Sequence, residues 1–360
     1  MMRINPNVFI LIKPPALIIW NYKTHEQFEI DRDHASRLWT LIDDISLFNT
    51  HNPLDHTLFS TGLIQLAQDD AEHWGWDILS RIFHVGTKDL ATEQQPHNTQ
   101  QWAHKYLMHC DNAMSRPFPA PHRLAAISTE NMLSLPPPLP NSKLVTDHSF
   151  TAALIKRKTC REFLRKSVSL EDISTLLYLS FGYLKERQED ISPLTPRNLA
   201  PRRSSPSAGG LNSCEAYLYA YNIRTLNPGI YYYHPALHAV RFIQKINTSL
   251  GTLMQGQHFI GNLAFGVFIT SRFDKLWWKY EHSRAYRAAL LEAGHLSQTF
   301  QLTATALGFS TWLSAAMNDS QVEKVLNINA MEEQVLLFTG GGHSTGAAFC
   351  EELNQLLAPR

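Results

Sequence analysis

Apolar residues near the start of the chain form two short runs and then take up helical spacing. The runs 8–12 and 16–22 flank Lys13, Pro14 and Pro15, which predicts two short strands joined at a turn. From Asp33, a candidate N-cap, apolar residues recur every three or four positions, which predicts a helix. A second helix is predicted over residues 57–72.

Strand-like runs and helical stripes also alternate from residue 149 onward. Ser169 predicts the start of a helix that ends before Gly182. Short apolar runs predict strands over 216–221, 230–233, 240–243, 265–270 and 335–339. We therefore expect one α+β domain over residues 149–360.

One helix in this domain is predicted to be long, covering residues 283–307, with Gly308 as its stop. The residues expected on its buried face are Leu290, Ala293, Leu296, Phe300, Ala304 and Leu307. The last strand is expected to end before Gly340, Gly341 and Gly342, which then form a turn.

Prolines cluster between the two patterned regions, around residues 117–121 and 136–140. Because proline fixes φ and removes a donor, residues 111–148 are predicted to be an extended linker. Residues 1–110 then form a small winged-helix-like α/β module, and we expect it to dock a peptide or a partner.

Bulk composition narrows the functional classes. Lys+Arg and Asp+Glu both total 32 in 360 residues, so nothing predicts binding to nucleic acid. No apolar run approaches the roughly 20 residues of a membrane helix, and the N-terminus lacks a signal-peptide pattern, so we expect a cytoplasmic protein. The 4 cysteines form no CxxC pair and the 17 histidines no HExxH frame, so we expect no metal site.

Two segments are candidates for binding an anionic ligand with a flat ring. Arg157, Lys158, Thr159 and Arg161 place three cations and a hydroxyl just before the helix at Ser169, which suits a phosphate. An ordinary solvated basic run is the competing interpretation.

The second of these segments is rich in small residues, which let a backbone approach a planar ligand closely. A flexible surface loop is the alternative. Its candidate ligand-binding residues are Ser205, Pro206, Ser207, Gly209, Gly210 and Asn212.

The third candidate segment holds Lys279 beside Tyr280, just before the long helix. A lysine next to a tyrosine can take part in proton transfer if the segment borders a pocket. Two solvent-facing polar residues are the alternative.

Together the segments resemble the SagB-type dehydrogenases of the nitroreductase superfamily, which include the azoline dehydrogenases of thiazole/oxazole-modified microcin biosynthesis. RKTCREF resembles the opening phosphate motif, SSPSAGGLNSCEAYLY the loop against the flavin ring, and GIYYYHPALHAV a recurring hairpin. KYEHSRAYRAALLEAGHLSQTFQLTATALGF resembles the long helix. The chain departs from the family at residues 212–214, where a basic residue, His and Pro are more usual, and at 308–310, where Gly-Leu-Gly is.

The resemblance implies FMN held at a homodimer interface. It assigns the FMN phosphate to Arg157, Thr159 and Arg161, and the ring to Ser205, Ser207, Gly209 and Gly210. Lys158, Pro206 and Asn212 are also expected to bind the cofactor. The resemblance places Gly308 and Ser310 near the flavin, and it implies that Lys279 and Tyr280 are catalytic.

The implied reaction is oxidation of a peptide thiazoline or oxazoline to the aromatic azole in a ribosomal peptide natural-product pathway. The implied partners are a precursor peptide and a YcaO-type cyclodehydratase. The alternatives are an NAD(P)H-dependent nitro or ene reductase, a flavin oxidase acting on another peptide group, and a non-catalytic peptide-binding scaffold.

Overall fold

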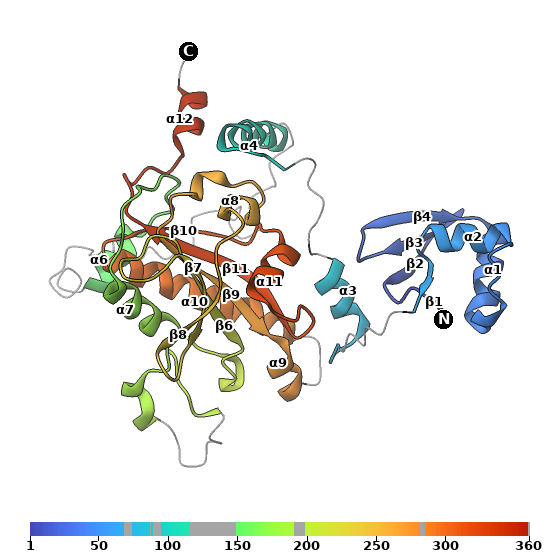
Figure 1. Ribbon diagram of the computed structural model, residues 1–360, viewed down its shortest axis with the longest axis horizontal. Coiled ribbons are helices and arrows are strands. Elements are labelled where there is room, and N and C mark those ends of the chain that lie inside the picture. Colours follow the sequence, from blue (N-terminus) through green and yellow to red (C-terminus); the bar gives the residue numbers. More distant parts are fainter. Residues whose placement is uncertain are drawn as a thin grey trace, which may run out of the picture. The chain divides into compact units, whose positions relative to one another are not determined.

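The computed structural model describes residues 1–67, 74–86, 88, 95–114, 149–190, 199–280 and 285–358 (Figure 1). By their internal contacts the residues divide into two compact units. One contains Met1–Ala91 and Trp277–Ser283, and the other contains Thr92–Leu276 and Arg284–Arg360. The predicted linker, residues 111–148, lies almost wholly outside the described residues, and the predicted domain boundaries stay a prediction.

The N-terminal unit is built from two small antiparallel sheets and short helices. The first sheet has the order β2-β3-β4, and the second pairs β1 with β5. A small core of Ile19, Leu41, Leu58 and Ile64 joins the sheets to the helices. The elements are β1 (Met2–Ile4), β2 (Val8–Lys13), β3 (Ala16–Asn21), β4 (Glu26–Ile30), α1 (Arg32–Asp43), η1 (Ile45–Leu47), α2 (Pro53–Ser60), β5 (Ile64–Leu66) and α3 (Ile78–Gly86).

The two predicted strands and the first helix of this unit are confirmed, with different ends. The N-cap of α1 is Asp31 rather than Asp33, because the Asp31 side chain accepts the backbone N–H of His34 at 2.8 Å. The second predicted helix, residues 57–72, is wrong over residues 61–67, and residues 68–72 lie outside the described residues. Gly62 has a φ of +71°, a conformation that ends a helix, and β5 follows it. The small sheets are present, and likeness to a winged helix stays a prediction.

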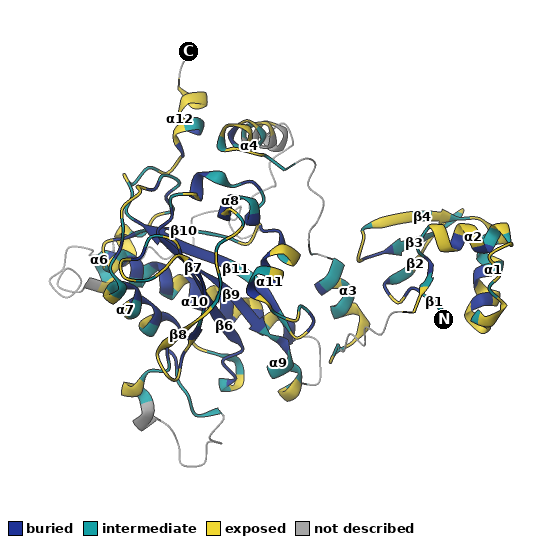
Figure 2. Ribbon diagram, viewed as in Figure 1, coloured by how far each residue is buried: buried dark blue, intermediate teal, exposed yellow. Residues whose placement is uncertain are grey.

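A six-stranded antiparallel sheet organises the C-terminal unit, with the order β10-β11-β9-β6-β7-β8. Its central strands are buried (Figure 2). The strands are β6 (Cys214–Ala220), β7 (Gly229–His234), β8 (Ala239–Gln244), β9 (Phe265–Arg272), β10 (Ser310–Ser314) and β11 (Glu333–Gly342). The α+β class predicted for this region is thus confirmed.

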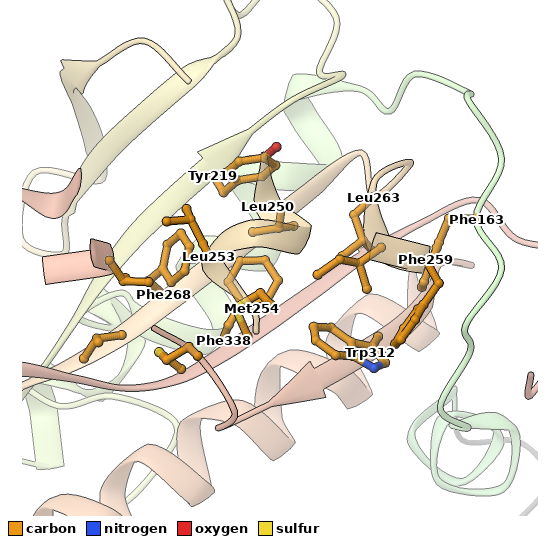
Figure 3. Close-up of a cluster of buried hydrophobic side chains, with 14 of the residues drawn as sticks. Phe163, Tyr219, Leu250, Leu253, Met254, Phe259, Leu263, Phe268, Trp312 and Phe338 are labelled. Atoms are coloured by element: carbon orange, nitrogen blue, oxygen red, sulfur yellow. The ribbon is translucent and has the colours of Figure 1, made fainter. Parts of the chain in front are cut away.

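Each face of this sheet packs against its own hydrophobic core. One core contains residues of α7 and α10, and the other contains residues of α8, α11 and α12 together with Phe163 and Trp312 (Figure 3). The helices are α4 (Thr99–Met114), α6 (Ser149–Lys156), α7 (Leu170–Phe181), η3 (Lys185–Asp190), η5 (Ala208–Gly210), α8 (Leu250–Leu253), η6 (His258–Ile260), α9 (Phe273–Lys279), α10 (Tyr286–Ala306), α11 (Asp319–Leu326) and α12 (Glu351–Leu357).

Most predicted elements of this unit are confirmed. Ser169 caps α7 by accepting the backbone N–H of Asp172 at 3.0 Å. The predicted face of α10 is wrong at Leu290, which is exposed, whereas Ala289 and Glu292 are buried. The last strand does not stop before the three glycines, because β11 pairs with β10 as far as Gly342.

Candidate functional site

The predicted ring-binding loop lines a cavity of about 430 Å³ in the C-terminal unit. Its walls come almost entirely from one stretch of chain between η3 and β6. The lining residues are Arg187, Leu199, Pro201, Arg202, Arg203, Ser204, Ser205, Pro206, Ser207, Gly209, Gly210 and Asn212. All six predicted ring-binding residues are therefore brought together at one cavity.

Positive φ angles give this loop its shape. Gly209, Gly210 and Asn212 have φ angles of +60°, +69° and +47°. Glycine tolerates this region because it has no Cβ, and asparagine tolerates it better than most residues. A Cβ on Gly210 would lie 3.2 Å from the carbonyl oxygen of Leu199. A side chain at position 210 would therefore press against the Leu199 backbone, so the turn packs closely there.

Glu292 binds the loop through hydrogen bonds and was not predicted from the sequence as a site residue. It belongs to α10 and is only 3% exposed. Its carboxylate accepts hydrogen bonds from the Ser207 and Ser213 hydroxyls at 2.7 and 3.0 Å and from the Cys214 backbone N–H at 3.0 Å. One signal was available in the sequence: a charged residue on the helix face shared by Ala289 and Ala293.

Arg203 is the buried cation of the site and is 4% exposed. Its Nη1 donates to the Cys214 carbonyl at 2.8 Å and lies 3.7 Å from a Glu292 oxygen. The guanidinium carbon lies 5.4 Å from the centre of the Tyr183 ring. Its Nε has no hydrogen-bond partner among the described residues. Because buried N–H groups are nearly always paired, this nitrogen leaves a donor that a ligand can use.

Cys214 ends the loop as a buried thiol. Burial raises the pKa of this thiol well above its usual value, and the Glu292 carboxylate raises it further. The thiol therefore stays protonated, and a thiolate nucleophile at this position is not expected.

The predicted phosphate segment is a structured strip beside β10. Thr159 bridges to Thr311, and the Cys160 N–H donates to the Thr311 carbonyl at 2.9 Å. Phe163 anchors the strip in the core (Figure 3). Gly308, with a φ of +84°, ends α10 and leads into Ser310, the first residue of β10. The structure thus brings the predicted phosphate segment close to Gly308 and Ser310, which were also predicted to lie near the cofactor.

The three cations of the strip are used differently. Arg161 donates from Nη1 to the Ala348 carbonyl at 2.8 Å. No side-chain hydrogen bond or ion pair engages Arg157 or Lys158 within the part of the chain that the structure describes. Arg157 is half-buried and Lys158 is exposed, so both keep their charge available for an anion.

The ring loop and the phosphate strip both border α10. Ser205 hydrogen-bonds to Thr299 of α10 at 2.7 Å, and α10 packs against α6, which leads directly into Arg157. None of the cations of the strip lines the loop cavity. The two groups therefore share a supporting helix and not a cavity.

Lys279 and Tyr280 belong by their contacts to the N-terminal unit. Lys279 is the last residue of α9 and is exposed, and the Tyr280 carbonyl accepts the Trp76 indole N–H at 3.0 Å. The Trp277 ring meets the Trp74 ring edge-on, with centroids 5.6 Å apart. Their predicted catalytic role stays a prediction.

The described residues contain no group of His, Cys, Asp and Glu side chains that could hold a metal ion. None of their helices is long and apolar enough to cross a membrane.

Known proteins provide an independent comparison. The chain is 31% identical to the microcin B17-processing protein McbC of Escherichia coli over 135 residues, which are 36% of this chain and 49% of McbC. It is 26% identical to the trifolitoxin operon protein TfxC of Rhizobium leguminosarum bv. trifolii over 181 residues, 48% of this chain and 50% of TfxC. The chain thus spans about half the length of these two relatives.

A solved structure of the E. coli microcin synthetase McbBCD complex with truncated pro-MccB17 bound is also similar. The match has 23% identity and a TM-score of 0.44, and covers 69% of this chain and 96% of the matched chain. The sequence pattern of the nitroreductase family matches residues 154–343, more than half of the chain. The chain therefore belongs to the nitroreductase family.

Proposed function

We propose that this chain is an FMN-dependent dehydrogenase that oxidises azoline rings of a ribosomally made peptide to azoles. The observation that supports a flavin most strongly is the loop cavity around Gly209 and Gly210. At about 430 Å³ it falls within the roughly 300–1,000 Å³ of small-molecule pockets. Gly209 and Gly210 line this cavity without side chains, and the Arg203 Nε has no hydrogen-bond partner among the described residues. Both features suit a flat ring edged with hydrogen-bond acceptors.

The phosphate of FMN is assigned to Arg157, Lys158 and Thr159. Arg157 and Lys158 supply positive charge that no described side chain neutralises, and Thr159 supplies a hydroxyl. These residues do not line the loop cavity of the same chain. A second copy of the chain could therefore bring its phosphate-binding residues to this cavity. We therefore propose a homodimer in which the ring loop and the phosphate strip of a site come from different copies. The neighbouring helices α6 and α10 expose Phe150, Leu154, Ile155, Leu290 and Leu291, an apolar surface suited to such a contact.

FMN held by these residues would supply the redox chemistry, as acceptor of a hydride from the azoline ring, with dioxygen as the final oxidant. The ring must also lose a proton from carbon, and this chain supplies groups for that transfer. Lys279 takes the proton as a neutral amine or, as an ammonium, polarises the ring nitrogen. Tyr280 orients the ring or relays the proton. The kinship with McbC and TfxC supports this assignment over reduction of a small molecule.

The N-terminal unit is proposed to hold the precursor peptide or to dock to the cyclodehydratase. It has a groove of about 550 Å³ between the β2–β3 turn and α1. Trp39, which is 67% exposed, forms one wall, and Leu17 and Ile30 belong to the sheet side. An exposed tryptophan beside aliphatic residues is a typical anchor for a peptide side chain.

The purified protein separates the candidate functions. It is expected to contain FMN, and anaerobic mixing with a thiazoline-containing peptide is expected to bleach the flavin absorbance while NADPH does not. Prompt bleaching by NADPH alone would indicate the nitro or ene reductase. A colourless protein that still binds peptide would indicate a scaffold.

A further inference from the structure

Most hydrogen bonds inside the ring loop connect residues only a few positions apart. The Gly210 N–H donates to the Ser207 carbonyl at 3.1 Å, the Leu211 N–H to the Ala208 carbonyl at 3.2 Å and the Asn212 N–H to the Ser207 hydroxyl at 2.8 Å. The Asn212 side-chain amide donates to the Pro201 carbonyl at 3.1 Å. The left-handed conformation at Asn212 costs free energy and persists only where surrounding groups enforce it. A group outside the turn that binds both of its ends would therefore help to keep Asn212 in this conformation.

Glu292 supplies that support from the middle of α10. Its two oxygens bind one residue at the start of the turn, Ser207, and two at its end, Ser213 and Cys214. The Ser207 hydroxyl donates to Glu292 while accepting the Asn212 N–H, so the carboxylate also fixes the strained residue. A carboxylate is suited to this place because it only accepts hydrogen bonds and all three neighbours donate.

We infer that Glu292 is a positioning residue that holds the loop in the conformation competent to bind the flavin ring. It acts through Ser207, Ser213 and Cys214 and does not itself touch the ligand. Arg203 provides a positive charge beside the buried carboxylate, with Nη1 3.7 Å from a Glu292 oxygen. This inference rests on the proposed flavin function.

Substitution by glutamine tests the role while keeping the shape of the side chain. The Cys214 N–H still needs an acceptor, so the amide oxygen turns toward it and the amide NH₂ faces the two serine hydroxyls. Glu292→Gln is expected to weaken FMN binding by about tenfold, the scale of a lost charge-assisted hydrogen bond. Ser207→Ala is expected to weaken it less, and the double variant no more than Glu292→Gln alone. The matched control is Glu171→Gln, at an exposed glutamate of α7.

Two readouts are needed: the FMN dissociation constant from flavin fluorescence, and hydrogen exchange of residues 207–214 without FMN. Faster exchange in this loop together with weaker FMN binding in Glu292→Gln supports the inference. Wild-type exchange and affinity in Glu292→Gln overturn it, as do effects equal to those of the control. If Glu292→Gln does not fold, Ser207→Ala and Ser213→Ala carry the test with the same readouts. If the wild type binds no FMN, the proposed function fails, and the exchange data alone decide whether Glu292 holds the loop.

Discussion

Single residues of the site differ in whether their charge already has a partner. Glu292 and Arg203 lie buried against each other, with 3.7 Å between the nearest oxygen and nitrogen. Arg157 and Lys158 have no side-chain partner among the described residues. The first pair therefore maintains structure, and the second pair is available to an anionic ligand.

Arg157→Ala is predicted to weaken FMN binding by about tenfold or more, because a charge-assisted bond to the phosphate is lost. Riboflavin, which has no phosphate, is predicted to bind the variant as well as it binds the wild type. Fluorescence titration with both ligands measures the difference. Arg165→Ala is the control, since Arg165 already bonds to Asn262 at 2.9 Å. Equal losses for FMN and riboflavin would contradict the phosphate assignment.

Glu333 gives a prediction for stability. Burial raises the pKa of this carboxyl above its usual value of 4.5, despite hydrogen bonds from Thr270 and Tyr217. The folded state thus holds the proton more tightly than the unfolded state. The protonated Glu333 carboxyl therefore adds to the free energy of unfolding at low pH. This contribution is lost as the pH rises from 4.5 through the raised pKa.

Glu333→Gln keeps a side-chain oxygen that accepts hydrogen bonds and removes the charge. The stability of the variant should therefore not decrease as the pH rises, and the variant should unfold at a higher temperature than the wild type near neutral pH. Thermal unfolding across a pH series measures this. Glu332→Gln, at the exposed neighbouring residue, is the control. An unchanged pH slope in Glu333→Gln would show that another group causes it.

Sequence alone was enough to find residues whose chemistry is local. The basic strip, the serines and paired glycines of the loop, and the Ser169 cap all depend on neighbours a few positions away. Glu292 was missed because its donors lie 78 to 85 residues away along the chain. The Trp76–Tyr280 bond spans 204 residues and was invisible for the same reason.

At the scale of elements, backbone conformation decides what each turn can do. The paired glycines predicted an open loop, but only the structure shows that Asn212 shares their left-handed conformation. Short elements were the hardest to predict: β4, β5 and β10 have five, three and five residues. A few residues show too little periodicity to predict a strand before its pairing partner is known.

Two glycine substitutions separate the effect of a steric contact made by a new Cβ from the effect of the left-handed backbone conformation. Gly210 and Gly62 both have positive φ, but only a Cβ on Gly210 meets a neighbour within 4 Å. Gly62→Ala is predicted to cost about 1–2 kcal/mol of stability and to keep FMN binding. Gly210→Ala is predicted to lose FMN binding because the loop has to shift. Denaturant unfolding and FMN titration check both, and full FMN affinity in Gly210→Ala would contradict the role of the loop.

For the whole molecule, the open question is how a complete site is assembled. The ring loop and the phosphate strip share α10 but no cavity, and α6 and α10 leave large apolar side chains exposed. Neither the exposure of Leu290 nor the separation of the two groups follows from sequence periodicity. Both become apparent only when the packing is known, and both favour a homodimer.

Leu291→Asp is predicted to shift the protein from dimer to monomer, because Leu291 is 63% exposed and a charge there opposes burial. FMN affinity is predicted to fall with the dimer, since the proposed site takes residues from two copies. Sedimentation and FMN titration over a concentration series measure both. A monomeric variant with wild-type FMN affinity would contradict the shared site.

The proposed reaction is oxidation of azolines by means of Lys279 and Tyr280. The most direct measurement supplies a thiazoline-containing peptide and dioxygen to the wild type and to Lys279→Ala, and follows the peptide by mass spectrometry. The wild type is expected to remove two hydrogens from each ring it oxidises, with hydrogen peroxide as the co-product. Lys279→Ala is expected to bind FMN and to form no azole. Azole formation at the wild-type rate by Lys279→Ala would remove Lys279 from the mechanism, and no azole from the flavin-loaded wild type would contradict the proposed reaction.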